Sequence, residues 1–297
     1  MVLQFTPQTT TQRRARRTLR TEIQSLPAIQ NQDDFSSHAI WTAGRRRLRE
    51  LILSRDPRGF LTWDIVTETM FPSYGPFVRE ELKLLRKNNW GVWRTALREP
   101  RLGLPFPCFI YPRSSANTIH HAYHLCRFQL ETSSTISDYS VILEFGGGYG
   151  SLCRLCHGIG FRGKYILFDF PEQSALQRYY LSSVGLAEIV TISDVNLLRE
   201  TAESTSGGQR LFIATWSLSE SAIPLRREIA VIAQSFDAFL IAFQEEFPGI
   251  DNPAYFREWQ AAFPDVAWTE SKITHLPENR YLLGSKKTPH CSRRESV

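Results

Sequence analysis

Residues 141–150 read Val-Ile-Leu-Glu-Phe-Gly-Gly-Gly-Tyr-Gly, a short apolar run that reaches a carboxylate and then continues into glycines. Such a run predicts a buried strand whose C-terminal end enters a tight turn. Glycine lets the backbone approach a ligand closely and adopt a positive φ without steric cost. Four glycines within five residues therefore indicate a binding loop, with a purely structural turn as the alternative.

The spacing of these glycines separates two kinds of nucleotide ligand. They form G-x-G-x-G from Gly146 to Gly150, and Ser151 occupies the last glycine position of the dinucleotide fingerprint G-x-G-x-x-G. A dinucleotide brings a pyrophosphate, which binds backbone N–H groups at a helix N-terminus. S-adenosylmethionine instead brings a sulfonium and an ammonium, and the carboxylate of Glu144 beside the glycines suits that cationic ligand better. The loop alone leaves both ligands open.

Length and composition indicate a globular protein. The chain has 297 residues, of which 42% are hydrophobic, enough for one α/β core and a further small domain. No run of about 18 apolar residues predicts a membrane span, and no apolar signal-peptide core follows Met1. A soluble, cytoplasmic protein with free thiols is therefore expected. Cys153, Cys156 and His157 spell the C-x-x-C-H of haem c attachment, but without an export signal the cysteines are interpreted as small buried side chains.

The net charge of +5 is modest and unevenly distributed. Arginines cluster within residues 13–20 and 45–49, where a solvated tail and helix face explain them. A nucleic-acid partner is the alternative, because basic patches bind nucleic acid without sequence specificity. No aromatic-interleaved RNA-binding module accompanies them, so nucleic acid is not the expected partner. The acid-free first twenty residues also resemble a transit peptide in composition.

Four regions are expected along the chain. Residues 1–35 are polar and basic with little to bury, which predicts a flexible arm. Residues 36–135 are expected to form a helical lid that carries much of the substrate pocket, residues 136–290 the cofactor-binding α/β domain, and residues 291–297 a tail. Apolar periodicity predicts helices over residues 36–54 and 77–87 and from Ser115 or Asn117 to about Thr132, with a breaker-rich connector over residues 88–113.

From Tyr139 onward, strands and helices alternate, which is the pattern of a parallel sheet covered by helices on both faces. The fifth strand is followed by a last helix and two short runs that predict a terminal hairpin. The predicted strands are Val141–Phe145, Tyr165–Asp169, Ile189–Ile192, Leu211–Thr215, Ala238–Phe243, Val266–Thr269 and Arg280–Leu283.

This order, together with several phrases, resembles the class I S-adenosylmethionine-dependent methyltransferases. The likeness covers about Tyr139 to Lys287 and includes LEFGGGYGSLCRL, YILFDFPE, QRYYLSSVG and ATWSLSES. With ANTIHHAYHL just ahead of the sheet, these phrases are similar to a family of sugar O-methyltransferases. The resemblance implies a Rossmann-like, mostly parallel seven-stranded sheet with an antiparallel last strand and S-adenosylmethionine as cofactor. It also implies a sugar or glycosylated small molecule as methyl acceptor.

The same resemblance implies a set of cofactor-binding residues. Glu144 and the loop glycines match the first methyltransferase motif and would border the methionine part; these glycines are Gly146, Gly147, Gly148 and Gly150. Asp169 would bind the ribose hydroxyls, as an acid does in dinucleotide folds, and Phe170 would pack on the adenine. Asp194 matches the position that contacts the adenine amino group, with a helix N-cap as the alternative. Thr215, at the end of the fourth strand, would lie beside the cofactor.

Methyl transfer from a sulfonium is an in-line displacement, so the nucleophile and the methyl carbon must lie within about 3–3.5 Å of each other. A hydroxyl needs a base, which typically accelerates such a step by about 10²–10⁴-fold. His120, His121 and His124 precede the first strand and are candidates, because histidine titrates near neutral pH. Ordinary hydrogen bonding in a helix–sheet interface is the alternative. No third ligand with recognised spacing accompanies the i, i+4 histidine pair, so no metal is expected.

Ligands in open α/β sheets bind beyond the carboxyl ends of the strands. The fourth strand is followed by Trp216, Ser219 and Glu220, and the fifth ends near Gln244 and Glu245. Glu220 is a second candidate for the base, and the other four are candidates for substrate binding. A core tryptophan, a helix-capping serine and solvated acids are the alternatives.

These observations together predict an O-methyltransferase that uses S-adenosylmethionine and acts on a hydroxyl of a sugar-like molecule. An NAD-dependent oxidoreductase is the first alternative, disfavoured by Ser151. An RNA-modifying or nucleic-acid-binding protein that uses the arginine clusters is the second. A protein that binds the cofactor without transferring its methyl group is the third.

Overall fold

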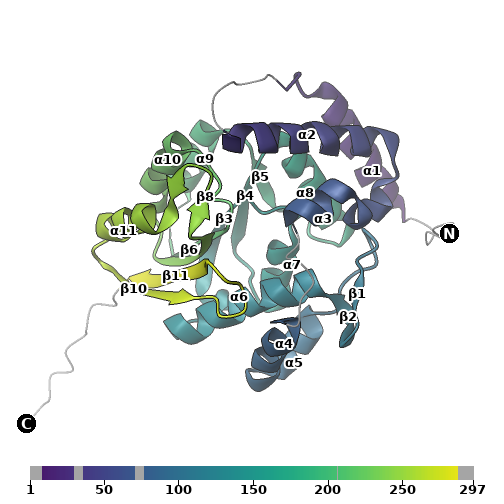
Figure 1. Ribbon diagram of the computed structural model, residues 1–297. Helices are drawn as coiled ribbons and strands as arrows, with labels where there is room; N and C mark the ends of the chain where they lie inside the picture. Colours follow the sequence, from purple (N-terminus) through teal and green to yellow (C-terminus); the bar gives the residue numbers. More distant parts are fainter. Residues whose placement is uncertain (1–8, 30–35, 71–76, 206, 287–297) are drawn as a thin grey trace, which may run out of the picture.

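A sheet of seven strands forms the centre of the protein (Figure 1). The computed structural model describes residues 9–29, 36–70, 77–205 and 207–286. The strands are parallel except β11, which lies antiparallel between β7 and β10. In spatial order, the strands are β10 Val266–Lys272, β11 Asn279–Lys286, β7 Ala238–Gln244, β6 Gln209–Thr215, β3 Tyr139–Phe145, β4 Lys164–Phe168 and β5 Val190–Ile192. The predicted mostly parallel seven-stranded sheet with an antiparallel last strand is confirmed.

Helices cover both faces of the sheet (Figure 1). Successive residues of a strand point to opposite faces, so Ile142 packs into one apolar core and Leu143 into the other. Strands that are buried on both faces need a near-continuous apolar sequence, which the run at 141–145 has apart from Glu144. One face is covered by α9 Val195–Ser204, α10 Ile223–Ala233 and α11 Asn252–Ala262. The other is covered by α7 and α8, which are Ser151–Gly158 and Pro171–Ser183.

The N-terminal helices pack on the same face as α7 and α8. Helix α1 contacts α8, and α6 contacts α7. Their buried side chains, such as Leu48, Leu82 and Ile119, belong to the core of that face, so the helical region and the sheet share one apolar core. The N-terminal elements are α1 Thr10–Ser25, α2 Ser36–Ser54, the 3-10 helix η1 Pro57–Thr62, α3 Asp64–Met70, α4 Phe77–Lys87, α5 Trp90–Ala96, β1 Pro107–Cys108, β2 Tyr111–Ser115 and α6 Ala116–Thr132. Three short elements remain: η2 Ile136–Asp138, β8 Glu246–Phe247 and β9 Ile250–Asp251.

The predicted N-terminal helices agree closely with the structure. Helices α2 and α4 have the predicted bounds, and Ser115 caps α6, where its Oγ accepts a hydrogen bond from the Thr118 N–H at 3.2 Å. The connector over residues 88–113 contains helix α5 and the β1–β2 hairpin, neither of which the sequence predicted. Helix α5 has seven residues and is held by the burial of Trp93, a tertiary contact that a local pattern does not reveal.

The prediction of a flexible arm is wrong for its central part. Residues Thr10–Ser25 form α1, which begins with a capping box between Thr9 and Gln12. Leu19 and Ile23 are each 1% exposed and belong to the shared core. These two apolar side chains at i, i+4, together with the ion pair between Glu22 and Arg178 of α8, hold this basic helix against α8. Residues 1–8 and 30–35 of the expected arm, and the expected tail over residues 291–297, lie outside the described residues.

The C-x-x-C-H cysteines are core residues. Cys153 and Cys156 are fully buried in α7, and burial raises the pKa of both thiols well above the usual range. Reactive cysteines are partly exposed and have lowered pKa values, so these two are inert packing groups. None of the helices in the described part of the chain combines the length and the apolarity needed to cross a bilayer.

Candidate functional site

The glycine loop lies at the carboxyl end of β3, in the centre of the sheet. Gly146, Gly148 and Gly150 have φ values of 74°, 56° and 92°, in the left-handed region that glycine adopts without strain. A Cβ atom on Gly146 would lie 2.2 Å from the Cβ of Ser217, which follows β6. The loop therefore sits between the ends of β3 and β6, where the connections leave in opposite directions and open α/β sheets bind ligands.

Asp169 follows β4 and binds the glycine loop directly. Its Oδ2 accepts hydrogen bonds from the Gly148 N–H at 3.1 Å and from Gln177 Nε2 at 2.9 Å, and its Oδ1 accepts one from the Phe170 N–H at 2.8 Å. Burial raises the pKa of Asp169 to about 7, although these hydrogen bonds lower it. The carboxylate therefore helps to fix the loop backbone, and the predicted contact of Asp169 with a ribose stays a prediction.

Glu144 lies on the interior side of the glycine loop, away from solvent. It is 2% exposed, and Tyr165 donates a hydrogen bond from its hydroxyl to Oε2 at 2.7 Å. Burial raises the pKa of Glu144 to about 7. The carboxylate therefore faces the interior, and the predicted contact of Glu144 with a cofactor stays a prediction.

Asp194 caps a helix. Its Oδ1 accepts a hydrogen bond from the Leu197 N–H at 2.9 Å at the start of α9, so the capping alternative is confirmed, and the contact with adenine stays a prediction. Thr215 ends β6, and Trp216 after it has a φ of 64°, which is uncommon for a bulky residue and is typical of functional sites. Its Nε1 donates a hydrogen bond to Asn279 Oδ1 at 2.6 Å, which fixes the indole at the edge of the site.

Helix α2 lies over the start of α8, next to the residues that follow β4. Trp41 and Phe170 are 6.2 Å apart by ring centroid, and the Arg45 guanidinium lies 4.9 Å from the centre of the Phe170 ring. Arg45 Nε and Arg49 Nη2 lie 2.8 and 2.5 Å from the two oxygens of Glu172, a side chain with no exposed surface. Burial would raise the pKa of Glu172, but these two hydrogen bonds lower it overall. Two arginines of the second cluster therefore hold α2 against α8.

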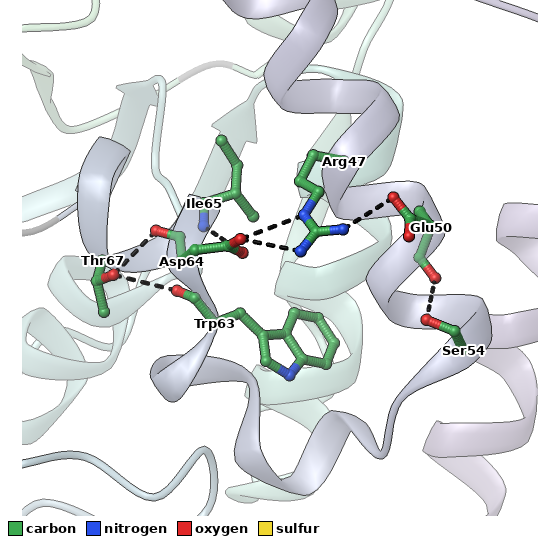
Figure 2. Close-up of polar contacts among 7 residues, drawn as sticks. All are labelled: Arg47, Glu50, Ser54, Trp63, Asp64, Ile65 and Thr67. Atoms are coloured by element: carbon green, nitrogen blue, oxygen red, sulfur yellow. Dashed lines mark hydrogen bonds and ion pairs between the residues drawn. The ribbon is translucent and has the colours of Figure 1, made fainter.

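A second contact joins α2 to α3 at the surface (Figure 2). Arg47 lies between Asp64 on α3 and Glu50 on its own helix, with both N–O distances at 2.9 Å. Arg47 is 37% and Asp64 50% exposed, and ion pairs in water contribute little because solvent screens them. The position of α2 over the site therefore depends more on the buried Glu172 than on Arg47.

The three predicted histidines of α6 have different environments. His120 Nδ1 lies 2.5 Å from Glu81 Oε1, and His124 Nδ1 makes a short hydrogen bond with the Tyr281 hydroxyl of β11. Burial lowers the pKa of His121 to about 3 and that of His124 well below its usual value. Both of these histidines are therefore neutral and only weakly basic at neutral pH.

Glu81 brings a further histidine to this place. His275, in the loop between β10 and β11, lies with its Nε2 2.9 Å from the same Oε1. The Trp216 indole stacks on the His120 ring at 5.6 Å and meets the His124 ring at 5.3 Å. Trp216 directly precedes Ser217, which contacts Gly146 of the glycine loop. The histidines that pack on Trp216 therefore lie at the same end of the sheet as the loop. The sequence did not identify Glu81 as a site residue, and it offered His275 only as a minor candidate.

The residues predicted at the ends of β6 and β7 make contacts with one another and with Arg280. Ser219 has no exposed surface and donates a hydrogen bond to Gln244 Oε1 at 2.8 Å, and Glu245 lies 2.6 Å from Arg280. Gln244 in turn donates a hydrogen bond from Nε2 to Glu220 Oε1 at 3.2 Å, and burial raises the pKa of Glu220 to about 7. Ser219 and Glu245 are therefore occupied by internal contacts, and Glu220 remains as a titratable group near the end of β6.

The order of the sheet, with one antiparallel strand inserted beside the edge strand, is that of the class I methyltransferase fold. No protein-family model matches the sequence, and no curated protein matches it significantly.

A comparison with solved structures finds partial similarities to several proteins. Magnesium protoporphyrin IX methyltransferase from Synechocystis, solved with bound S-adenosylmethionine, is 12% identical, with 73% of this chain and 100% of that chain covered and a TM-score of 0.41. The fibrillarin pre-rRNA processing protein of Methanococcus jannaschii is 15% identical, with 51% and 68% covered and a TM-score of 0.39. A ribosomal protein L11 methylase from Lactobacillus delbrueckii is 14% identical, with 57% and 80% covered and a TM-score of 0.41.

Proposed function

We propose that this protein is an S-adenosylmethionine-dependent methyltransferase that methylates a hydroxyl oxygen of a small, sugar-like molecule. The observation that carries the proposal is the glycine loop between the ends of β3 and β6, with Asp169 bonded to its backbone. The sheet supports it as well, because the order that binds dinucleotides is built from parallel strands, whereas β11 is antiparallel. An NAD-dependent oxidoreductase is thereby disfavoured.

In this proposal, the cofactor lies along the carboxyl edge of β3 and β4. Its methionine part rests on the glycine loop, and its ribose reaches Asp169. Oδ1 of that carboxylate accepts one hydrogen bond in the protein, from the Phe170 N–H, and a carboxylate oxygen has two lone pairs. A ribose hydroxyl can therefore donate to Oδ1 without displacing the loop. Phe170 is 37% exposed and offers its ring to the adenine beneath α2, which makes α2 a lid.

The acceptor enters from the side of Trp216 in this proposal. Its oxygen attacks the methyl carbon in line as the carbon–sulfur bond breaks, and its proton passes to a base. Glu220 suits this role better than the buried histidines, because its pKa of about 7 lies near neutral pH and that of His121 is about 3. A base with a pKa near the working pH combines the correct ionisation state with adequate strength.

The arginine clusters give little support to a nucleic-acid partner. Arg45 and Arg49 bind Glu172, and Arg20 donates a hydrogen bond from Nη2 to the Arg55 carbonyl at 2.9 Å. These side chains fasten helices α1 and α2 to the rest of the protein. The positions of Arg20, Arg45 and Arg49 are therefore explained by intramolecular contacts, whereas Arg13, Arg14 and Arg17 are exposed on α1.

Titration calorimetry with S-adenosylmethionine tests the cofactor. We expect one site per chain and at least tenfold weaker binding for Asp169→Asn, which corresponds to about 1.4 kcal/mol. Asp251→Asn is the matched control, because Asp251 caps α11 by accepting from the Ala254 N–H and should leave the affinity unchanged. Binding of NAD in place of S-adenosylmethionine, or equal binding by the wild type and Asp169→Asn, would contradict the proposal.

A screen of labelled methyl transfer to sugars, polyols and phenols tests the acceptor. Glu220→Gln should lower the transfer rate by about 10²-fold or more, without weakening cofactor binding, if Glu220 is the base. If the protein binds the cofactor but methylates none of these acceptors, it is better described as a cofactor-binding protein without catalytic activity. Unchanged transfer by Glu220→Gln would remove Glu220 from the mechanism.

A further inference from the structure

Three side chains of metal-ligand type meet where α4, α6 and the β10–β11 loop come together. Glu81, His120 and His275 each offer one ligand atom, and these atoms lie within 4.8 Å of one another. Glu81 is 39 residues from His120 and 194 residues from His275 in the sequence. We propose that these three residues bind a divalent transition-metal ion, with zinc as the best match. Two histidines and one glutamate form a well-known zinc ligand set, which leaves a fourth position open.

The charge of the cluster favours a bound cation. Glu81 has no exposed surface and His120 is 1% exposed. A carboxylate that is removed from water needs a positive partner or several hydrogen bonds. Within the described residues, the ion-pair partners of Glu81 are His120 and His275, and no arginine or lysine is among them. A divalent ion supplies the missing charge, and both imidazoles can then bind it in their neutral form.

Buried polar atoms without partners give a second, independent indication. Over the part of the chain that the structure describes, Glu81 Oε2 and His120 Nε2 are buried and have no hydrogen-bond partner, and neither has His124 Nε2. Most buried polar atoms in proteins do have one. Glu81 Oε2 is the atom that joins Oε1 when a carboxylate binds a metal with both oxygens. The contacts of the cluster therefore leave donor capacity that a metal ion or its bound water can use.

Admitting the ion requires the three ligand atoms to move to the separations of a metal site. Oε1 of Glu81 lies 2.5 Å from His120 Nδ1 and 2.9 Å from His275 Nε2. Around a tetrahedral zinc with bonds of about 2.0–2.2 Å, neighbouring ligand atoms lie about 3.3 Å apart. Phe77 stacks on the His275 ring at 5.4 Å, and Tyr123 meets that ring edge-on at 5.3 Å. The aromatic rings hold His275 in place, so Glu81 Oε1 must move away from both nitrogen atoms to make room for the ion.

A metal ion at this place would clamp the helical region to the end of the sheet beside Trp216. Two of its ligands come from α4 and α6, and the third comes from the loop that precedes β11. The inference rests on Glu81, His120 and His275 alone, and it holds or fails independently of methyl transfer.

Calorimetry with zinc chloride on the chelator-treated full-length chain tests the inference, together with thermal unfolding. We expect one zinc ion per chain and a higher unfolding temperature when zinc is saturating. His275→Gln should lose both effects, with its unfolding temperature in zinc compared with that of the same variant in chelator. Glu81→Gln is the second variant, and it should also lose zinc binding.

His157→Gln is the matched control, because His157 is a half-buried histidine on α7 outside the cluster. It should bind zinc like the wild type. Absence of zinc binding by the wild type, unchanged binding by His275→Gln, or equal loss in His157→Gln would overturn the inference. Calorimetry with S-adenosylmethionine on the same samples reports the cofactor site separately, so failure of one proposal is distinguishable from failure of the other.

Discussion

Glu144 offers a quantitative test of how the loop is built. Its carboxylate is 2% exposed, and burial raises its pKa from 4.5 to about 7. Each unit of pKa corresponds to 1.36 kcal/mol, so the shift corresponds to about 3 kcal/mol. Because the pKa is higher in the folded protein than in the unfolded chain, the protonated carboxyl contributes stability below pH 4.5, and this contribution is lost as the pH rises through 7.

Glu144→Gln removes the ionisation and keeps an oxygen that accepts the Tyr165 hydroxyl. The free energy of unfolding of the variant, minus that of the wild type, should therefore increase by about 3 kcal/mol from pH 4 to pH 8.5. Urea unfolding at both pH values measures this gain as a change in the free energy of unfolding. The cost of burying the new amide N–H groups is the same at both pH values, so it cancels in the comparison.

Glu188→Gln, at an exposed position, controls for the loss of one negative charge at the surface. A gain for Glu144→Gln that is equal at pH 4 and pH 8.5, or no larger than that of the control, would refute the argument from burial. Because the Glu144 carboxylate faces the interior, we also expect Glu144→Gln to bind S-adenosylmethionine with wild-type affinity. Loss of cofactor binding in a folded variant would show that the negative charge itself is required.

Two further predictions concern the loop and the lid. In urea unfolding, Gly146→Ala should destabilise the protein more than Gly185→Ala. Both residues have a positive φ, but only the Cβ on Gly146 would collide with Ser217. Equal losses of stability would contradict the steric argument. Glu172→Gln should increase hydrogen exchange in α2 much more than Arg47→Gln does, because it leaves two arginines without their buried carboxylate; equal exchange would mean that the surface pair holds the lid.

Most of the sheet could be predicted from the sequence. Strands buried on both faces are short apolar runs, and five of them alternate with helices from Tyr139 onward. The place of β11 could not be derived from periodicity, since a hairpin pattern does not say which strand of the sheet it joins. Helix α1 was missed because basic residues hide its two buried side chains, Leu19 and Ile23. Tertiary packing, rather than local propensity, determines that helix.

The surroundings of the glycine loop were predicted better than those of the histidine cluster. A glycine loop and the acid after the next strand are local patterns, and parallel strands bring their ends together. Glu81 lies 39 residues before His120, and its only signal is its place between Val78 and Leu85 on the apolar side of α4. A carboxylate on the buried stripe of a helix predicts a partner, but the sequence does not reveal that the partner lies on α6.

Helix α6 contacts both the glycine loop and the histidine cluster, and so fixes their relative positions. Asn117 donates a hydrogen bond from Nδ2 to the Tyr149 hydroxyl at 3.3 Å, and Tyr149 belongs to the glycine loop. One turn further along, His120 binds Glu81, and the next turn places His124 against Tyr281 of β11. All three α6 side chains are buried, so none can move without breaking packing. In the proposed reaction, in-line transfer tolerates little misalignment, and a single rigid helix that contacts both the glycine loop and the histidine cluster would align cofactor and acceptor.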